Sequence, residues 1–71
     1  MNCIFTTHAR LRMRLRQVTE EMVATTIGHP DRQGSGYRNR LLAFKRFEEG
    51  VLKVVYKLQG DRPFIVTVIW E

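Results

Sequence analysis

The spacing of apolar residues changes along the chain from a helical period to a strand period. In the first part, apolar positions recur every three to four residues, which predicts helices over residues 8–16 and 19–28. In the second part, apolar and polar residues alternate, which predicts strands over residues 40–47, 51–58 and 64–70. We therefore expect an α+β fold in which two N-terminal helices pack on one face of a three- to four-stranded antiparallel meander.

The predicted helices have recognisable ends. Thr6 or Thr7 can cap the first helix with its hydroxyl, and Thr19 can cap the second. Gly28 is expected to end the second helix, because Pro30 prevents its continuation into the next turn.

Two segments lie outside this pattern. Residues 2–5 are a short apolar run that could form an edge strand or a lid on the core. Residues 31–36 contain Gly34-Ser35-Gly36, but no strand leads into this sequence and no helix follows it, so the context of a phosphate-binding loop is missing. We expect this segment to be a flexible connection.

The last two predicted strands differ in the composition of their faces. In the middle strand one face is apolar and the other carries lysines, so we expect one face to meet the helices and the other to contact water at least in part. The apolar set is Leu52, Val54, Tyr56 and Leu58, and the opposite set is Lys53, Val55 and Lys57. The last strand is apolar on both faces, with Phe64, Val66, Val68 and Trp70 alternating with Ile65, Thr67 and Ile69. We expect it to be covered on both faces, inside the sheet or against a second copy of the chain.

The length and composition limit the class of protein. A chain of 71 residues makes one small domain, residues 1–71, which buries only about 60% of its unfolded surface and would gain from a dimer or a tight partner. The single cysteine, Cys3, cannot form an internal disulfide. The first apolar run is far shorter than a signal sequence or a membrane span, so we expect a cytoplasmic protein without membrane association. Two histidines and one cysteine without close spacing argue against a zinc site, and we expect no metal and no cofactor.

The chain is basic, with 12 Lys and Arg against seven Asp and Glu and a net charge of +5. Nine basic and three acidic residues precede residue 48, so the excess lies on the first predicted helix and on residues 37–46. Such a charge favours a polyanion or an acidic protein as partner, although it would also serve solubility alone.

Four arginines and a histidine crowd into the first predicted helix. Because a helix turns by about 100° per residue, His8, Arg12 and Arg16 form one stripe along it. Arg10 and Arg14 lie nearly opposite. The stripe is flanked by Ala9 and Met13 on one side and by Leu11 and Leu15 on the other. Burial of both apolar flanks would draw the stripe into a groove and leave the opposite arginines in water.

The chain contains the sequence T-H-A-R-L-R-M-R-L-R-Q-V-T-E-E-M-V, followed by I-G-H-P-D and, near its end, by V-V-Y and V-T-V. These motifs resemble the bacterial family described as domain of unknown function 4258, and the resemblance covers almost the whole chain. It carries over onto His8, Ala9, Arg12, Met13, Arg16, Val18, Thr19, Val23, Ile27, Pro30, Asp31 and Thr67. Gln17 departs from the family pattern, in which a glycine that permits a tighter turn is common at this position.

That family is in turn similar to the RelE/ParE and barnase-like small toxins, which pair N-terminal helices with a small antiparallel sheet. Some of those proteins cut RNA without a metal, and ParE-type members act on gyrase instead. The resemblance thus implies a RelE/ParE-like fold and a toxin-like protein of a toxin–antitoxin type system, with RNA or an acidic antitoxin protein as partner.

Metal-independent RNA cleavage needs a base, cations that bind the phosphate, and an acid. His8 could act as the base, Arg12 could hold the phosphate, and Lys53 or Tyr56 could complete the catalytic set. The expected RNA- or anion-binding residues are Arg12, Arg16, Arg40, Lys53 and Lys57. Tyr37, Tyr56 and Trp70 could stack on bases, although aromatic residues on strands belong mostly to the core.

Each of these side chains also has a purely structural interpretation. The His8 ring could cover the core or bond a carbonyl, whereas Arg12 and Arg16 could pair with carboxylates. The available carboxylates are those of Glu20, Glu21, Asp31 and Glu71. Three classes of function therefore remain open: a toxin-like endoribonuclease or RNA binder, a non-enzymatic protein-interaction module, and a structural homodimer.

Overall fold

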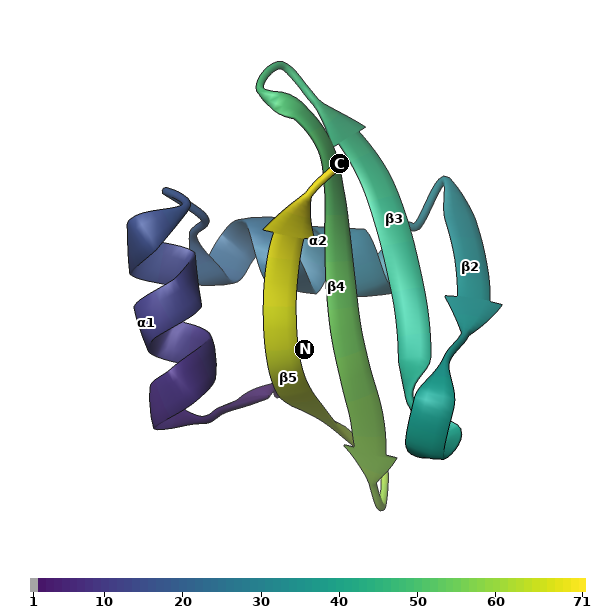
Figure 1. Cartoon of the computed structure of the whole chain (residues 1–71). Helices are drawn as coiled ribbons and strands as arrows, with labels where there is room; N and C mark the ends of the chain where they lie inside the picture. The colour runs from purple at the N-terminus through teal and green to yellow at the C-terminus, as the bar shows by residue number, and fades with distance from the viewer. Residues whose placement is uncertain (1) are drawn as a thin grey trace.

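The computed structural model describes residues 2–71, which form two helices and a five-stranded mixed sheet (Figure 1). The helices are α1 (Thr7–Leu15) and α2 (Glu20–Gly28), and the strands are β1 (Ile4–Phe5), β2 (Arg32–Ser35), β3 (Leu41–Phe47), β4 (Gly50–Gln59) and β5 (Arg62–Trp70). A 3-10 turn, η1 (Tyr37–Asn39), links β2 to β3. The strand order is β1-β5-β4-β3-β2, with β1 parallel to β5 and the other pairs antiparallel. The predicted α+β class, both helices and the three predicted strands are confirmed.

The sheet is larger than the predicted three- to four-stranded antiparallel meander, because two short strands extend it. Residues 2–5 contain the edge strand β1, whose parallel pairing makes the sheet mixed. Residues 31–36 contain β2, so the prediction of a flexible connection was wrong. Strand β2 has no apolar alternation to reveal it, because main-chain pairing with β3 holds it in place. The Leu42 side chain lies over Gly34 and Gly36, within 3.6–3.7 Å of where a Cβ atom would stand.

Both predicted helix starts are confirmed, with Thr6 as the cap of α1. Its Oγ1 accepts a hydrogen bond from the Ala9 N–H at 3.0 Å. Thr19 Oγ1 accepts one from the Met22 N–H at 3.1 Å, and two carboxylates follow in the first turn of α2. Each hydroxyl satisfies one of the main-chain donors that a helix start leaves free.

The break between the helices is held by a residue in the left-handed region. Val18 N–H donates to Met13 O at 2.8 Å and Gln17 N–H donates to Arg14 O at 3.3 Å, the two bonds of a Schellman motif. Gln17 occupies the left-handed position of this motif, with φ of 56°. Gln17 therefore makes this turn with more backbone strain than a glycine would have at the same position.

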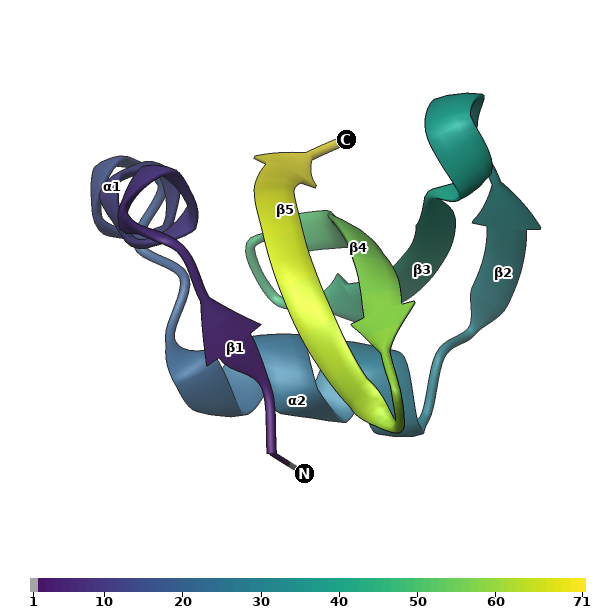
Figure 2. The ribbon, with the colours of Figure 1, turned by 90° about the horizontal axis from the view of Figure 1, so that it is seen from below.

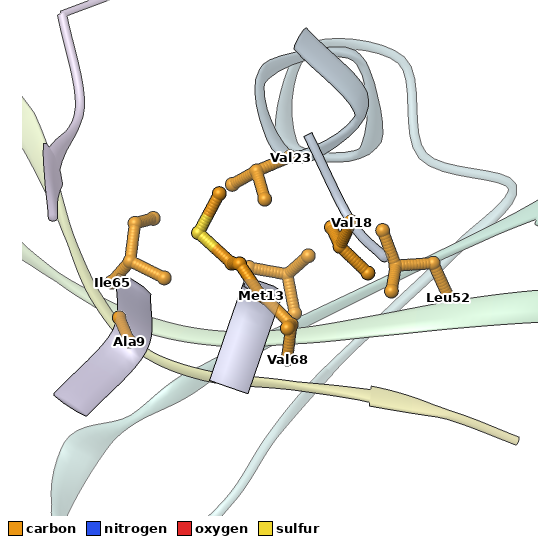
Figure 3. Packing of buried hydrophobic residues seen from close by; sticks show 8 residues of the cluster. Ala9, Met13, Val18, Val23, Leu52, Ile65 and Val68 are labelled. Atoms are coloured by element: carbon orange, nitrogen blue, oxygen red, sulfur yellow. The ribbon is translucent and has the colours of Figure 1, made fainter. Parts of the chain in front are cut away.

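The core lies between the sheet and the helices. Figure 2 shows α2 lying across one face of the sheet, while α1 lies along the outer edge of β5 rather than across that face as predicted. The buried cluster consists of Ala9, Met13, Val18, Val23, Leu52, Val54, Ile65 and Val68 (Figure 3). The predicted alternation in β4 is confirmed from Leu52 to Tyr56, whereas Leu58 is 55% exposed near the end of that strand.

Strand β5 does not alternate as its sequence predicts. A register shift opposite Val55 and Tyr56 gives β5 one extra residue, so Ile65 pairs with Tyr56 while Val68 pairs with Val54. Ile65 and Val68 therefore share the core face, although the alternation placed them on opposite faces. A strand that is apolar on both sides hides such a shift, because either register buries apolar side chains.

Both ends of α1 are joined to β5 by hydrogen bonds. Arg16 Nη1 donates to Val68 O at 2.8 Å, and Trp70 Nε1 donates to Arg16 O at 2.7 Å. At the other end, Thr6 Oγ1 donates to Ile65 O at 3.4 Å. The last strand thus lies inside the sheet, as expected, between β1 and β4, with α1 along the rest of its edge. The expected cover on both faces is not seen within residues 2–71, because Phe64, Thr67 and Ile69 are half-buried on the face opposite α2.

The positive φ of Gln17 predicts how a glycine at this position would change the stability of the protein. We expect Gln17→Gly to raise the free energy of unfolding by about 0.5–1 kcal/mol, because glycine adopts positive φ without a Cβ clash. Gln59→Gly is the matched control and should lower that free energy, because Gln59 has ordinary strand geometry. Urea unfolding measures both, and a loss of stability in both variants would contradict the motif.

The hydrogen bonds to β5 predict that Arg16 and Arg12, two arginines of one stripe, contribute differently to the stability of the protein. We expect Arg16→Ala to lower the free energy of unfolding by about 1–2 kcal/mol, because the Val68 carbonyl loses a charged donor. Arg12→Ala should cost less than about 0.5 kcal/mol, since the Arg12 side chain bonds only exposed His8. Equal losses in thermal or urea unfolding would show that Arg16 does not secure the edge.

Candidate nucleic-acid interface

The sheet face opposite α2 is not covered by either helix of residues 2–71, and we call it the open face (Figure 2). Register and alternation place the following side chains on it: Arg32, Leu42, Phe44, Arg46, Val51, Lys53, Val55, Lys57, Phe64, Thr67 and Ile69. Four of these residues are cationic and none is acidic. The predicted solvent-facing lysines Lys53 and Lys57 therefore belong to a larger basic surface.

The cations of the open face lie beside aromatic and aliphatic side chains. The Arg32 guanidinium stacks over the Phe44 ring at 4.0 Å, and Lys57 Nζ lies 5.1 Å from the centre of the Phe64 ring. Lys53 is half-buried and stands in register between Phe44 and Ile69. Such contacts cover the apolar rings while the charged groups keep donors free for an anion.

Few of the cations are neutralised by the protein itself. Within residues 2–71 there are two ion pairs, Arg10–Glu20 at 2.6 Å and Lys45–Asp31 at 3.8 Å. Lys45 Nζ also donates to the last turn of α2, at His29 O, 3.1 Å away, so it ties α2 to β3. The expected anion-binding residues, by contrast, are all outside these pairs. They are Arg12, Arg16, Arg40, Lys53 and Lys57.

The stripe on α1 is only partly assembled as predicted. Arg12 Nε donates to His8 Nε2 at 3.4 Å, which requires the imidazole to accept at that nitrogen. Arg16 is instead engaged by the Val68 carbonyl. The expected burial of both flanks is wrong, because Leu11 and Leu15 are 52% and 65% exposed. A helix that packs along one sheet edge buries only one flank, so the stripe lies at the surface and not in a groove.

The proposed catalytic residues do not form one cluster. Strand β5 lies between α1 and Lys53, and no hydrogen bond within residues 2–71 joins Lys53 to His8 or Arg12. Tyr56 faces the core side, where burial raises the pKa of its phenol and favours the protonated form. Arg40 is half-buried just after η1, at the far end of the β2–β3 hairpin.

Sequence reasoning missed two cations of the open face. Arg46 could have been found, because it alternates with Leu42 and Phe44 along a strand that was predicted. Arg32 could not, because its strand, β2, carries no alternation signal. 

The described part of the chain offers no metal site. Within residues 2–71, no three His, Cys, Asp or Glu side chains lie close enough together to hold an ion. Burial raises the pKa of the Cys3 thiol, which favours its less reactive protonated form. In the same residues, no helix is long and apolar enough to cross a membrane.

Comparison with known proteins places the chain in a family. No curated protein and no solved structure matches it. The family described as Domain of unknown function (DUF4258) matches residues 5–70, from the last residue of β1 to the last residue of β5. The protein therefore belongs to the DUF4258 family.

Proposed function

We propose that this protein binds RNA through the open face, as a toxin-like small basic protein of the cytoplasm. One observation carries the proposal: a sheet face left free by the helices of residues 2–71 holds Arg32, Arg46, Lys53 and Lys57. None of the side chains on its strands is acidic, and the Asp31 carboxylate lies at its margin, where it accepts from the Arg46 N–H at 2.8 Å. Charges of one sign gathered on one surface repel each other, and a phosphate backbone neutralises them with release of counterions.

The apolar side chains between these cations favour a nucleic acid over a simple anion. Phe64 and Ile69 are half-buried on the open face, and Phe44 lies beneath the Arg32 guanidinium. Unpaired bases gain free energy by contact with aromatic and apolar side chains, whereas inorganic phosphate does not. The RelE/ParE-like relationship would add a toxin–antitoxin setting to this binding function.

Cleavage of the bound RNA is the finer form of the proposal. It is supported by the proximity of His8 and Arg12, whose Nε lies 3.4 Å from His8 Nε2, because an imidazole beside a cation that can move onto a phosphate has a nitrogen lone pair to offer as general base once that hydrogen bond is released. Arg12 would then lie beside the attacked phosphate. Lys53 stands opposite Ile69, whereas the start of α1, where His8 lies, contacts Ile65, so the two residues are at different positions along β5 and Lys53 is assigned to binding.

A protein partner is the second candidate, supported by a different surface. Leu11 and Leu15 are exposed on α1 and flanked by Arg12 and Arg14. An acidic protein, such as an antitoxin, would cover the leucines and pair with the arginines, and a second copy of the chain would cover the leucines alone. Sedimentation at micromolar concentration separates a homodimer from a monomer that is free to bind other partners.

The proposal predicts a specific loss of salt-dependent binding. We expect Lys53→Gln combined with Lys57→Gln to weaken binding of a short oligouridylate and to reduce the slope of log affinity against log salt by about 1.4, for two phosphate contacts. Arg14→Gln is the matched control and should have a much smaller effect, because Arg14 lies on the far side of α1. Fluorescence anisotropy at several salt concentrations measures both.

Equal losses in the two variants would indicate a diffuse positive surface, and no binding by the wild-type protein would overturn the proposal.

The same RNA, analysed on a denaturing gel after incubation with the protein, tests cleavage. His8→Ala should leave the affinity for RNA unchanged and abolish any cleavage, since we propose His8 as the general base and not as a residue that binds phosphate.

A further inference from the structure

The loop between β2 and β3 has a defined but strained shape. Gly36 N–H donates to Arg40 O at 2.8 Å, and Arg40 N–H donates to Tyr37 O at 3.2 Å, so the loop is closed at its base. Between these bonds Arg38 and Asn39 both have positive φ, of 60° and 61°. Asparagine tolerates this region, but arginine does so only at a cost of about 1 kcal/mol or more. Strained backbone of this kind is found preferentially where a site must hold one conformation.

This loop presents the Tyr37 side chain to solvent. Tyr37 is 92% exposed. Of the aromatic residues considered for base stacking, it alone is free: Trp70 donates to Arg16 O and contacts the Phe47 ring edge-on at 6.3 Å, while Tyr56 packs against the core. The Tyr37 ring is therefore available to a ligand without loss of any contact within residues 2–71.

The surroundings of Tyr37 are positively charged. Arg38 follows Tyr37 directly and Arg40 lies three residues on, whereas Arg32 and Arg46 lie at the other end of the β2–β3 hairpin. Because Leu41 pairs with Tyr56, Arg40, the residue directly before β3, lies near Lys57 of β4 at this end of the sheet. Figure 2 shows β2 and η1 on the side of the sheet opposite α2, which is also the side of the open face. A chain bound at the loop can therefore continue onto the open face.

We propose that Tyr37 is a stacking platform for one unpaired base of single-stranded RNA, whose flanking phosphates contact Arg38 and Arg40. This inference rests on the proposed RNA binding and specifies the class of RNA. In a duplex each base is already stacked between its neighbours, so an exposed tyrosine ring on a loop has no free base face to contact. In a single strand the free base face can stack on the ring while the arginines neutralise the backbone.

The test compares three variants with a single-stranded oligouridylate and a duplex RNA of the same length. We expect Tyr37→Ala to weaken binding of the single strand about tenfold, with an unchanged salt slope, because a base stack and not a phosphate contact is lost. Tyr37→Phe keeps the ring and should bind within about twofold of the wild type. Arg38→Gln should reduce the salt slope by about 0.7. Duplex binding should not respond to Tyr37→Ala.

The possible outcomes separate this inference from the proposed function. If the wild type binds the single strand through Lys53 and Lys57 but Tyr37→Ala has no effect, the stacking site is overturned and RNA binding stands. If Tyr37→Ala weakens duplex and single strand equally, the stacking site is likewise overturned. If the wild type binds neither RNA, both proposals fail. Because Tyr37 is exposed, we expect its substitution to leave the fold intact, so that a loss of binding cannot be attributed to misfolding. Circular dichroism of each variant checks this.

Discussion

The attachment of α1 to the edge of β5 is the interaction on which the rest of the structure depends. Strand β1 pairs with only the first part of that edge, and the remaining main-chain groups would otherwise be open to another chain. Arg16 donates to Val68 O and its own carbonyl accepts from Trp70 Nε1, across 52 and 54 residues of sequence, which fixes the end of the first helix against the last strand. This attachment places Ala9 and Met13 in the core and so closes the fold.

The hydrogen bonds that join the helices to the sheet divide the basic residues into two groups. Arg16 and Lys45 serve the fold, because each donates to a main-chain carbonyl that joins a helix to the sheet. Lys53 and Lys57, on the open face, have no carboxylate within ion-pair distance in residues 2–71. These two lysines therefore keep their charge available to an anionic partner, which would lie on the side of the sheet away from α2.

Local signals in the sequence were sufficient for the helices and the long strands. The Thr19 cap and the alternation around Lys53 depend on residues close in sequence, and both are confirmed. The features that were missed depend on long-range pairing. Strand β2 exists because β3 lies beside it, and the shifted register of β5 follows from its pairing with β4. The exposure of Leu11 likewise reflects the position of α1 at an edge, which helical periodicity does not reveal.

We expect RNA to contact one face of the sheet and not the other. Methyl signals in NMR spectra test it directly, because Val54 and Val55 are neighbours on opposite faces of β4. On titration with oligouridylate, we expect the methyl signals of Val55 and Ile69 on the open face to shift, with those of Val54 and Val23 nearly unchanged. Larger shifts in the buried methyl groups, or shifts confined to Leu11 and Leu15 on α1, would contradict it.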